Sequence, residues 1–459
     1  MMLNGARQPL EGSTEKEFVY REKFMDNKKK LLALYQKNHP DDKHFCIEYV
    51  KDTQNGLEQN RIVVGITSIQ DVVNEQMIKQ MDMEYINIFK ENIMKFSQKN
   101  FLKSDGIYLK NADGEKVILK GTNFGGWLVF EKWMGAFTGA AAGLDAIELL
   151  ESRFGKENTK KLFDIYQDNY ITEADFDRAA ELGFNCLRLP FWYKNVETDT
   201  HGEYDFSRLD WAVEQCAERG IYAIIDCHGL PGFQSIAHHC GKINDCRLYD
   251  ETPEGEKYRQ ESAALWTAVA KRYKDNPAVA AYDLMNEPMC DFDEKQDDEA
   301  MWKVYDLLYK TVREIDPDHV IIMEAIWDFD HLPAPKEKGW ENVMYELHLY
   351  DPSDEAYTEI IRTAFAKGYD VPIFVGEFKP TTEAGHWDYI LNMFNENHVN
   401  WTTWTYKGHT DFGDTDWFIY GKSGKEHKAD LINDSYDTIA EKWGTALRTE
   451  NFTVMGDVA

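Results

Sequence analysis

The chain has 459 residues, of which 43% are apolar and 14% aromatic, and its 51 basic and 81 acidic side chains give a net charge of −30. This composition excludes disorder and a collagen-like repeat, and no apolar run reaches the roughly 18 residues that a membrane-spanning helix needs. The sequence therefore predicts a globular protein with neither nucleic acid nor membrane as a partner, because so acidic a surface repels phosphate backbones and anionic lipids.

The first 100 residues differ in composition from the rest. They hold 15 acidic and 15 basic side chains, so the whole net charge comes from residues 101–459, which also hold all 13 tryptophans. The net charge and the tryptophan content both change at this position, which predicts a domain boundary near Asn100. No chemical motif lies before it, so we expect residues 1–100 to form an accessory packing or docking module of unknown role.

Within residues 1–100, helical spacing predicts helices over 15–37 and 70–99. The runs FCIEYV and RIVVGI, on either side of the turn-like QNG, predict a hairpin between them.

Cysteine usage and the N-terminal sequence bear on the compartment. The seven cysteines are scattered, so we expect reduced thiols rather than a disulfide framework. The polar start MMLNGARQPLEGSTEKEF lacks the apolar core of a secretory signal, which favours a cytoplasmic protein over a secreted one unless a leader has been removed. The oligomeric state stays open.

Short apolar runs alternate with longer helical patterns after residue 100, beginning with a predicted hairpin that turns at Asp113-Gly114. Strand-like runs lie at 117–124, 185–190, 221–226, 279–288, 319–325, 343–350, 371–378 and 399–406. Helical patterns lie near 147–182, 207–219, 256–275, 297–315, 354–368, 384–397 and 428–443. This alternation predicts an α/β fold, a (β/α)8 TIM barrel over 101–459. An open doubly wound sheet is the alternative, but no glycine-rich dinucleotide turn follows the first strand.

Polar or aromatic side chains end six of these apolar runs, where the working residues of such a barrel project. They are Arg188, His228, Asn286, Glu287, His348, Tyr350, Glu377 and Trp404. Each alone has a structural explanation, such as a helix cap, an ion pair or a satisfied core histidine. Their coincidence at matching strand ends favours a functional site.

Glu287 and Glu377 most need a functional explanation, because burying carboxylates is energetically costly. Such a pair can hold a metal, share a proton, or act as acid and nucleophile on a glycosidic bond. His228 and His348 stand alone on separate strands, so a metal-dependent hydrolase is the weaker alternative. The loop 238–246, HHCGKINDC, has zinc-ligand residue types, but such a loop is more often structural or solvent-facing.

Seven strings, in order, resemble the blocks of glycoside hydrolase family 5, the cellulase-type family. They are GTNFGGWLVFEKW, AAELGFNCLRLPFWY, IDCHGLPGFQS, RYKDNPAVAAYDLMNEP, ELHLY, VPIFVGEF and WTTWTYK. The first and third are closest to the exo-β-1,3-glucanase branch. The resemblance implies a retaining glycosidase acting on β-glucans or β-glucosides, a β-linked glucan or oligosaccharide as its partner, and no metal or other cofactor. A catalytically silent carbohydrate-binding barrel is the remaining alternative, since a fold does not establish activity.

The resemblance also implies roles for single residues. Glu287 matches the family's general acid/base and Glu377 its nucleophile. The remaining matches are Arg188, His228, Asn286, His348, Tyr350 and Trp404, with Glu131 as a sugar-contacting carboxylate. From the residue types, we expect Arg188 and Tyr350 to keep Glu377 ionised, and the charge of Glu377 to keep Glu287 protonated. The region GFQSIAHHCGKINDC departs from the exoglucanase branch, so exo or endo action stays open.

Overall fold

The computed structural model describes the backbone of residues 45–54 and 57–66, and residues 96–289, 297–327, 329–350, 353–379, 384–409 and 417–455. The chain divides into two compact units, Met1–Lys95 and Phe96–Ala459. In the first unit, β1 (Phe45–Gln54) pairs antiparallel with β2 (Leu57–Ile66), which confirms the predicted hairpin. The predicted helix over 15–37 and most of that over 70–99 lie outside the described residues.

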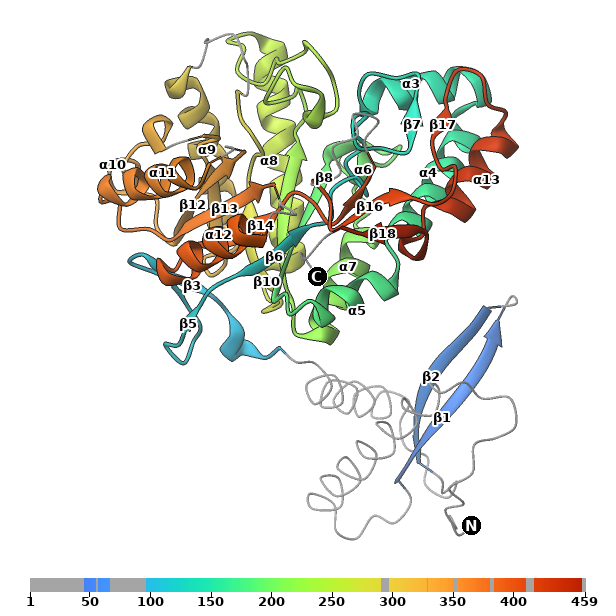
Figure 1. Cartoon of the computed structure of the whole chain (residues 1–459), viewed down its shortest axis with the longest axis horizontal. Coiled ribbons are helices and arrows are strands. Elements are labelled where there is room, and N and C mark those ends of the chain that lie inside the picture. The colour runs from blue at the N-terminus through green and yellow to red at the C-terminus, as the bar shows by residue number, and fades with distance from the viewer. Residues whose placement is uncertain are drawn as a thin grey trace. The chain divides into compact units, whose positions relative to one another are not determined.

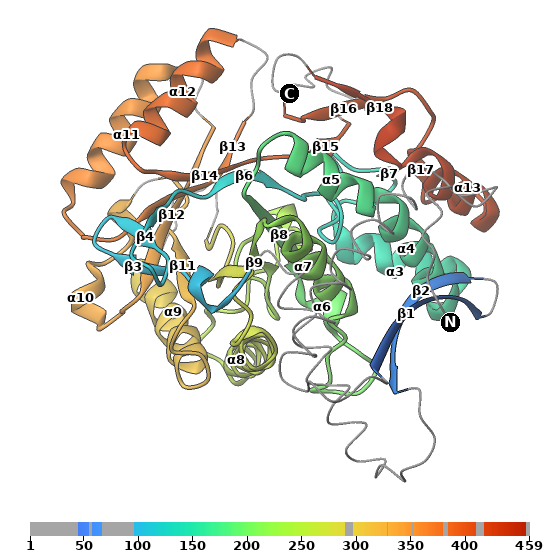
Figure 2. The same ribbon diagram turned by 90° about the horizontal axis from the view of Figure 1, so that it is seen from below.

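Eight parallel strands close into a barrel in the second unit (Figure 2). They are β6 (Lys120–Asn123), β8 (Cys186–Trp192), β9 (Tyr222–Gly229), β10 (Val279–Asp283), β11 (Val320–Glu324), β12 (Val343–Leu349), β13 (Ile373–Phe378) and β14 (Asn400–Thr403). Closure is made by β14 and β6, with Trp401 opposite Lys120. These strands are almost wholly buried because helices cover them outside and side chains fill them inside, which is why their sequences read as continuous apolar runs. The predicted TIM barrel is confirmed.

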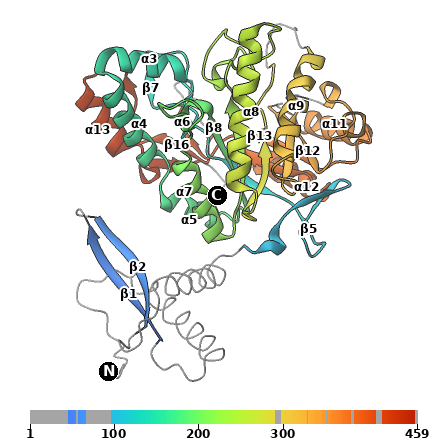
Figure 3. The ribbon, with the colours of Figure 1, turned by 180° about the vertical axis from the view of Figure 1, so that it is seen from behind.

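Helices surround the strands (Figures 1 and 2). The longer ones are α3 (Gly143–Phe154), α4 (Lys156–Tyr170), α5 (Glu173–Glu181), α7 (Ser207–Arg219), α8 (Pro253–Tyr273), α9 (Asp298–Arg313), α11 (Asp354–Ala366), α12 (Ala384–Glu396) and α13 (Tyr436–Ala446), and α6 (Tyr193–Val196) and α10 (Pro335–Lys338) are single turns. α8 and α9 lie side by side (Figure 3). None of the described helices is long and apolar enough to cross a bilayer.

The single helical pattern predicted over 147–182 is wrong, since three helices occupy it. Gly155 separates α3 from α4 with a φ of 79°, which glycine adopts without strain. Thr172 then starts α5, because its hydroxyl and backbone N–H meet the Asp175 carboxylate at the first turn. The last predicted helix, 428–443, begins only at Tyr436, after the short strand β17 (Ala429–Asp430).

Short strands complete the second unit. β3 (Lys103–Asp105), β4 (Tyr108–Lys110) and β5 (Lys116–Val117) form an antiparallel sheet, whose last two strands make the predicted hairpin, with Gly114 at a φ of 81°. β17 pairs with β7 (Phe137–Thr138), and β15 (Lys407–Gly408), β16 (Tyr420–Ser423) and β18 (Phe452–Val454) form a third sheet. α13 lies beside α4 (Figure 1), so the end of the described chain packs on the helices after the first barrel strand.

Candidate active site

The predicted site residues gather at one end of the barrel. Parallel strands present their carboxyl ends to one rim, so side chains from distant segments meet there. Arg188 lies in β8, His228 in β9, His348 in β12 and Glu377 in β13. Asn286 and Glu287 follow β10, Tyr350 follows β12, Trp404 follows β14, and Glu131 lies between β6 and β7. All nine except the partly buried Tyr350 are at most 7% exposed.

Arg188 is the fully buried cation at the centre of this end. Its guanidinium donates to Asp283 Oδ2 at 2.6 and 2.9 Å and to Glu377 Oε1 at 2.9 Å. It also donates to Asn286 Oδ1 at 2.8 Å, which turns the amide so that Nδ2 has no hydrogen-bond partner among the described residues. A buried N–H without a partner is costly, so Asn286 is set up to donate to a ligand.

Glu377 is held through both carboxylate oxygens. Arg188 donates to Oε1, and the Tyr350 hydroxyl donates to Oε2 at 2.6 Å. Burial raises the pKa of Glu377 to about 7, and His348, Arg188 and the Tyr350 hydrogen bond keep it from rising further. The carboxylate is therefore fixed in position, and it ionises around neutral pH.

Glu287 is held just as firmly, but by histidines. His348 Nδ1 lies 2.8 Å from Oε1, and His239 Nδ1 lies 2.8 Å from Oε2. Its backbone has a φ of 40°, in the left-handed region that costs a non-glycine residue about 1–3 kcal/mol, and its N–H donates to Glu324 Oε2. The two acidic side chains meet at one imidazole, because His348 Nδ1 is also 3.5 Å from Glu377 Oε2.

The predicted division of protons between the two glutamates is wrong for this structure. Burial opposes ionisation of Glu287, but His239 and His348 outweigh it and hold the pKa of its carboxyl well below the usual range. Arg188 and Tyr350 beside Glu377 are expected from the sequence, whereas nothing in the sequence places a second histidine beside Glu287.

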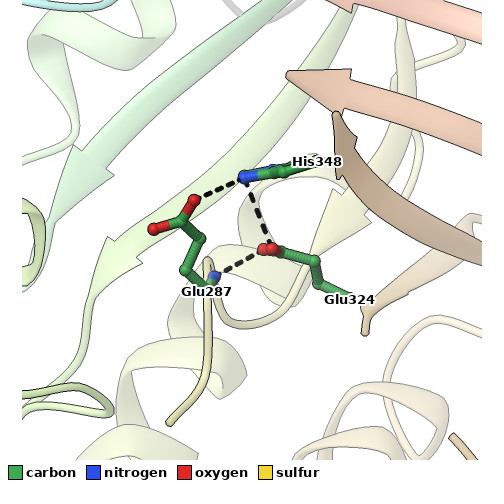
Figure 4. A group of neighbouring side chains, drawn as sticks. All are labelled: Glu287, Glu324 and His348. Atoms are coloured by element: carbon green, nitrogen blue, oxygen red, sulfur yellow. Dashed lines mark hydrogen bonds and ion pairs between the residues drawn. The ribbon is translucent and has the colours of Figure 1, made fainter. Parts of the chain in front are cut away.

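His348 also joins Glu287 to Glu324, which ends β11 (Figure 4). Atoms of these three side chains lie within 4.8 Å of one another, close enough to share a metal ion. The contacts already made account for this closeness, since His348 Nδ1 lies 2.8 Å from Glu287 Oε1 and 3.4 Å from Glu324 Oε1. Burial and the charge of Glu287 raise the pKa of Glu324 well above its usual range.

Aromatic side chains and a second histidine–glutamate pair line the same end. His228 stacks on Trp404, with centroids 5.3 Å apart and planes within 8°. Its Nδ1 contacts Asp226 at 2.7 Å, and burial with the nearby charge of Arg188 lowers its pKa well below 6.5, so the ring is neutral. Glu131 Oε2 accepts from Trp133 Nε1 at 2.8 Å and lies 2.9 Å from His238 Nε2.

Sequence reasoning missed six groups that contact the predicted site residues: Asp226, His238, His239, Asp283, Glu324 and Glu346. Glu324 ends a strand, so the criterion that found the others would have found it too. Asp226 and Glu346 are charged residues inside otherwise apolar strands, and Asp283 ends β10, so each has a usable signal. His238 and His239 have no such signal, and His239 is not solvent-facing, since it is only 7% exposed.

Removing the Tyr350 hydroxyl is expected to shift the acid side of the pH profile upward. The hydroxyl lowers the pKa of Glu377, so in Tyr350→Phe that pKa rises above about 7 and the carboxylate protonates at a higher pH. We expect any activity that needs ionised Glu377 to fall about 10²-fold at pH 6 and less at pH 8. Tyr357→Phe is the matched control, because its hydroxyl donates to the Leu349 carbonyl, away from Glu377. An equal loss for Tyr350→Phe at both pH values would contradict this role.

Comparisons with known proteins agree with this architecture. The family model described as Cellulase (glycosyl hydrolase family 5) matches residues 147–410. A β-xylosidase of Phanerodontia chrysosporium is 29% identical over 67% of this chain and 71% of its own length. A probable glucan 1,3-β-glucosidase A of Neosartorya fischeri is 27% identical over 57% of this chain and 65% of its own length. The rutinosidase structure from Aspergillus niger superposes with a TM-score of 0.52 at 18% identity, covering 68% of this chain and 92% of that one.

Proposed function

The chain belongs to glycosyl hydrolase family 5, and we propose on that basis that it is a retaining glycosidase cleaving β-glucosidic bonds of β-glucans or β-glucosides. The catalytic domain is assigned to residues 101–459, with residues 1–100 as an accessory module of unknown role.

One observation supports the pairing of Glu287 and Glu377 as the two carboxyl groups of this mechanism. His348 Nδ1 lies 2.8 Å from Glu287 Oε1 and 3.5 Å from Glu377 Oε2, so the two carboxyl groups face a common point. Retaining glycosidases need their two carboxyl groups about 5–5.5 Å apart, one to attack carbon and one to serve the leaving oxygen.

The chemistry proceeds in two displacements. Ionised Glu377 attacks the anomeric carbon, the bond from that carbon to the leaving oxygen breaks, and the leaving oxygen receives a proton at Glu287. Water then attacks the same carbon, loses a proton to Glu287 and releases Glu377. Two inversions at one carbon give net retention.

Neighbouring groups support this sequence of steps. Arg188 and Tyr350 fix both oxygens of Glu377, which leaves the carboxylate oriented before substrate arrives. Asn286 Nδ2 is free among the described residues to donate to a sugar hydroxyl, a contact that strengthens as positive charge develops on the sugar ring. Trp404 and Glu131 are assigned to the binding of that sugar, Trp404 by stacking and Glu131 by accepting from hydroxyls.

A substrate panel tests the function and its range. It includes aryl β-glucoside and β-xyloside, because the relatives are named for both sugars, together with β-1,3- and β-1,4-linked glucans and oligosaccharides. We expect hydrolysis of β-glucosides with the β-anomer as the first product by NMR. Monosaccharide alone indicates exo action, and a ladder of sizes indicates endo action.

The same assay separates the alternatives. No release from any β-glycoside would overturn the proposal in favour of a silent carbohydrate-binding barrel. Activity that EDTA abolishes and a divalent cation restores would instead establish a metal-dependent hydrolase.

A further inference from the structure

The histidine beside Glu287 bears on which group carries the general acid's proton in the free enzyme. A general acid of this kind is ordinarily a lone carboxylic acid, protonated before substrate binds. Here both oxygens of Glu287 face imidazole nitrogens at 2.8 Å, His348 Nδ1 at Oε1 and His239 Nδ1 at Oε2. An ionised carboxylate accepts two such N–H groups, whereas a protonated one has lost part of that capacity.

His239 is a buried and tethered part of the site. It lies in the short helical turn η2 (His238–Cys240), and its side chain is nine-tenths buried. The preceding Gln234 ties this segment to the acid, because its amide donates to the Asn286 carbonyl and its own carbonyl accepts from Met289 N–H. The chain on both sides of Glu287 is thus bonded to the loop that carries His239.

The charges around His239 favour its cation. The carboxylates near it are Glu287 from the segment after β10, Glu131 from the segment after β6, Glu377 from β13 and Asp226 from β9, while the facing His228 ring is neutral. Burial opposes the charge, but Glu287 outweighs it and raises the pKa of His239 above 6.5. His239 Nε2 has no hydrogen-bond partner among the described residues, so Glu287 is the partner that holds this ring.

We propose that His239 and Glu287 form a single proton-donating pair, in which His239 holds the proton in the free enzyme and Glu287 passes it to the leaving oxygen. The proposal rests on the glycosidase function proposed above. His239 acts through Glu287 and is a positioning residue in that sense.

Protons and bonds balance over one turnover. The free pair is an imidazolium and a carboxylate. As Glu377 bonds to the anomeric carbon and the leaving-group bond breaks, the proton moves from His239 Nδ1 to Glu287 Oε2, the carboxyl gives a proton to the leaving oxygen, and a neutral imidazole and a carboxylate remain. When water attacks the glycosyl ester, its proton returns to the pair. One macroscopic ionisation therefore governs the loss of activity at alkaline pH.

A leaving-group comparison in His239→Asn tests the pair. Asparagine keeps a hydrogen-bond donor near Nδ1 but holds no transferable proton. With an alkyl or weakly acidic aryl β-glucoside, whose leaving oxygen needs a proton, we expect kcat/KM to fall about 10²-fold or more. With 2,4-dinitrophenyl β-glucoside, which departs without protonation, the fall should be under about tenfold, and the alkaline limb of the pH profile should move.

His238→Asn is the matched control in the same turn, since His238 contacts Glu131 and not Glu287. Any fall in kcat/KM of His238→Asn should be the same for both leaving groups. If kcat/KM of His239→Asn falls by the same factor with both leaving groups and the pH profile does not move, the proposed pair is refuted.

An NMR titration of the histidine rings gives a readout that needs no turnover and no altered histidine. In the wild-type chain His239 should remain cationic above pH 6.5, and in Glu287→Gln its pKa should fall. An identical titration in the two proteins would overturn the proposal. Failure of the wild-type enzyme to hydrolyse even the dinitrophenyl glycoside would refute the proposed function instead, while the titration would still report on the pair.

Discussion

Replacing Glu377 with glutamine is expected to lower kcat by about 10⁴–10⁶-fold, because the amide keeps the shape of the side chain but cannot form the bond to the anomeric carbon. Arg188 and Tyr350 donate to the carboxylate oxygens, and an amide NH2 can accept from neither. Glu396→Gln, the same change at an exposed position of α12, is the control for the substitution itself. Steady-state hydrolysis of an aryl β-glucoside measures both, and undiminished turnover in Glu377→Gln would remove Glu377 from the mechanism.

Azide rescue of glycine variants distinguishes the two glutamates by stereochemistry. In Glu377→Gly, azide can occupy the vacated space and attack the anomeric carbon once, which gives an inverted α-glycosyl azide. In Glu287→Gly, azide intercepts the ester on Glu377, which gives a β-glycosyl azide of retained configuration. NMR of the products decides, and the reverse pattern would exchange the two assignments.

Replacing Arg188 with methionine is expected to cost about 3–5 kcal/mol of unfolding free energy at pH 7, because it leaves buried carboxylates without their cation. The side chain is fully buried, contacts Asp283 and Glu377 directly, and lies 3.2 Å from Asp226. Arg188→Lys keeps the positive charge but not the planar guanidinium that donates to several oxygens at once. Its unfolding free energy should therefore fall less than that of Arg188→Met. Urea unfolding of both variants measures the difference, and a methionine variant as stable as wild type would contradict this account.

The penalty in Arg188→Met should depend on pH in a defined direction. Burial already raises the pKa of Asp226 to about 7 despite the nearby guanidinium, and loss of that cation raises it further. A carboxyl whose folded pKa lies above its unfolded value is destabilising once the pH exceeds the unfolded value, near 4. Because Asp226 in the wild type is itself protonated below about pH 7, the two proteins differ at this carboxyl only above that pH, so the loss should be smaller in acid and grow between about pH 7 and pH 8. A loss that is greatest in acid would show that packing, not charge, is responsible.

Local patterns in the sequence account for most of the fold. The predicted helix over 207–219 coincides with α7, and each predicted barrel strand overlaps an observed one. Buried parallel strands need uniformly apolar runs, and amphipathic helices need a period near 3.6, so both leave a signal in neighbouring residues. The single helical pattern predicted over 147–182 is wrong for the opposite reason. Gly155 and Thr172 interrupt a continuous apolar period, and the period alone does not mark the breaks.

The chain order of strands and the polar residues that end them determined which side chains would meet at the rim of this barrel, since parallel strands place their carboxyl ends together. The folded molecule alone decided how charge is shared there. His239 comes from a turn with no periodic pattern, and only three-dimensional proximity brings it to Glu287. Because the strength of an electrostatic interaction depends on distance and burial and not on sequence separation, the protonation of the two glutamates could not be read from the residues in order.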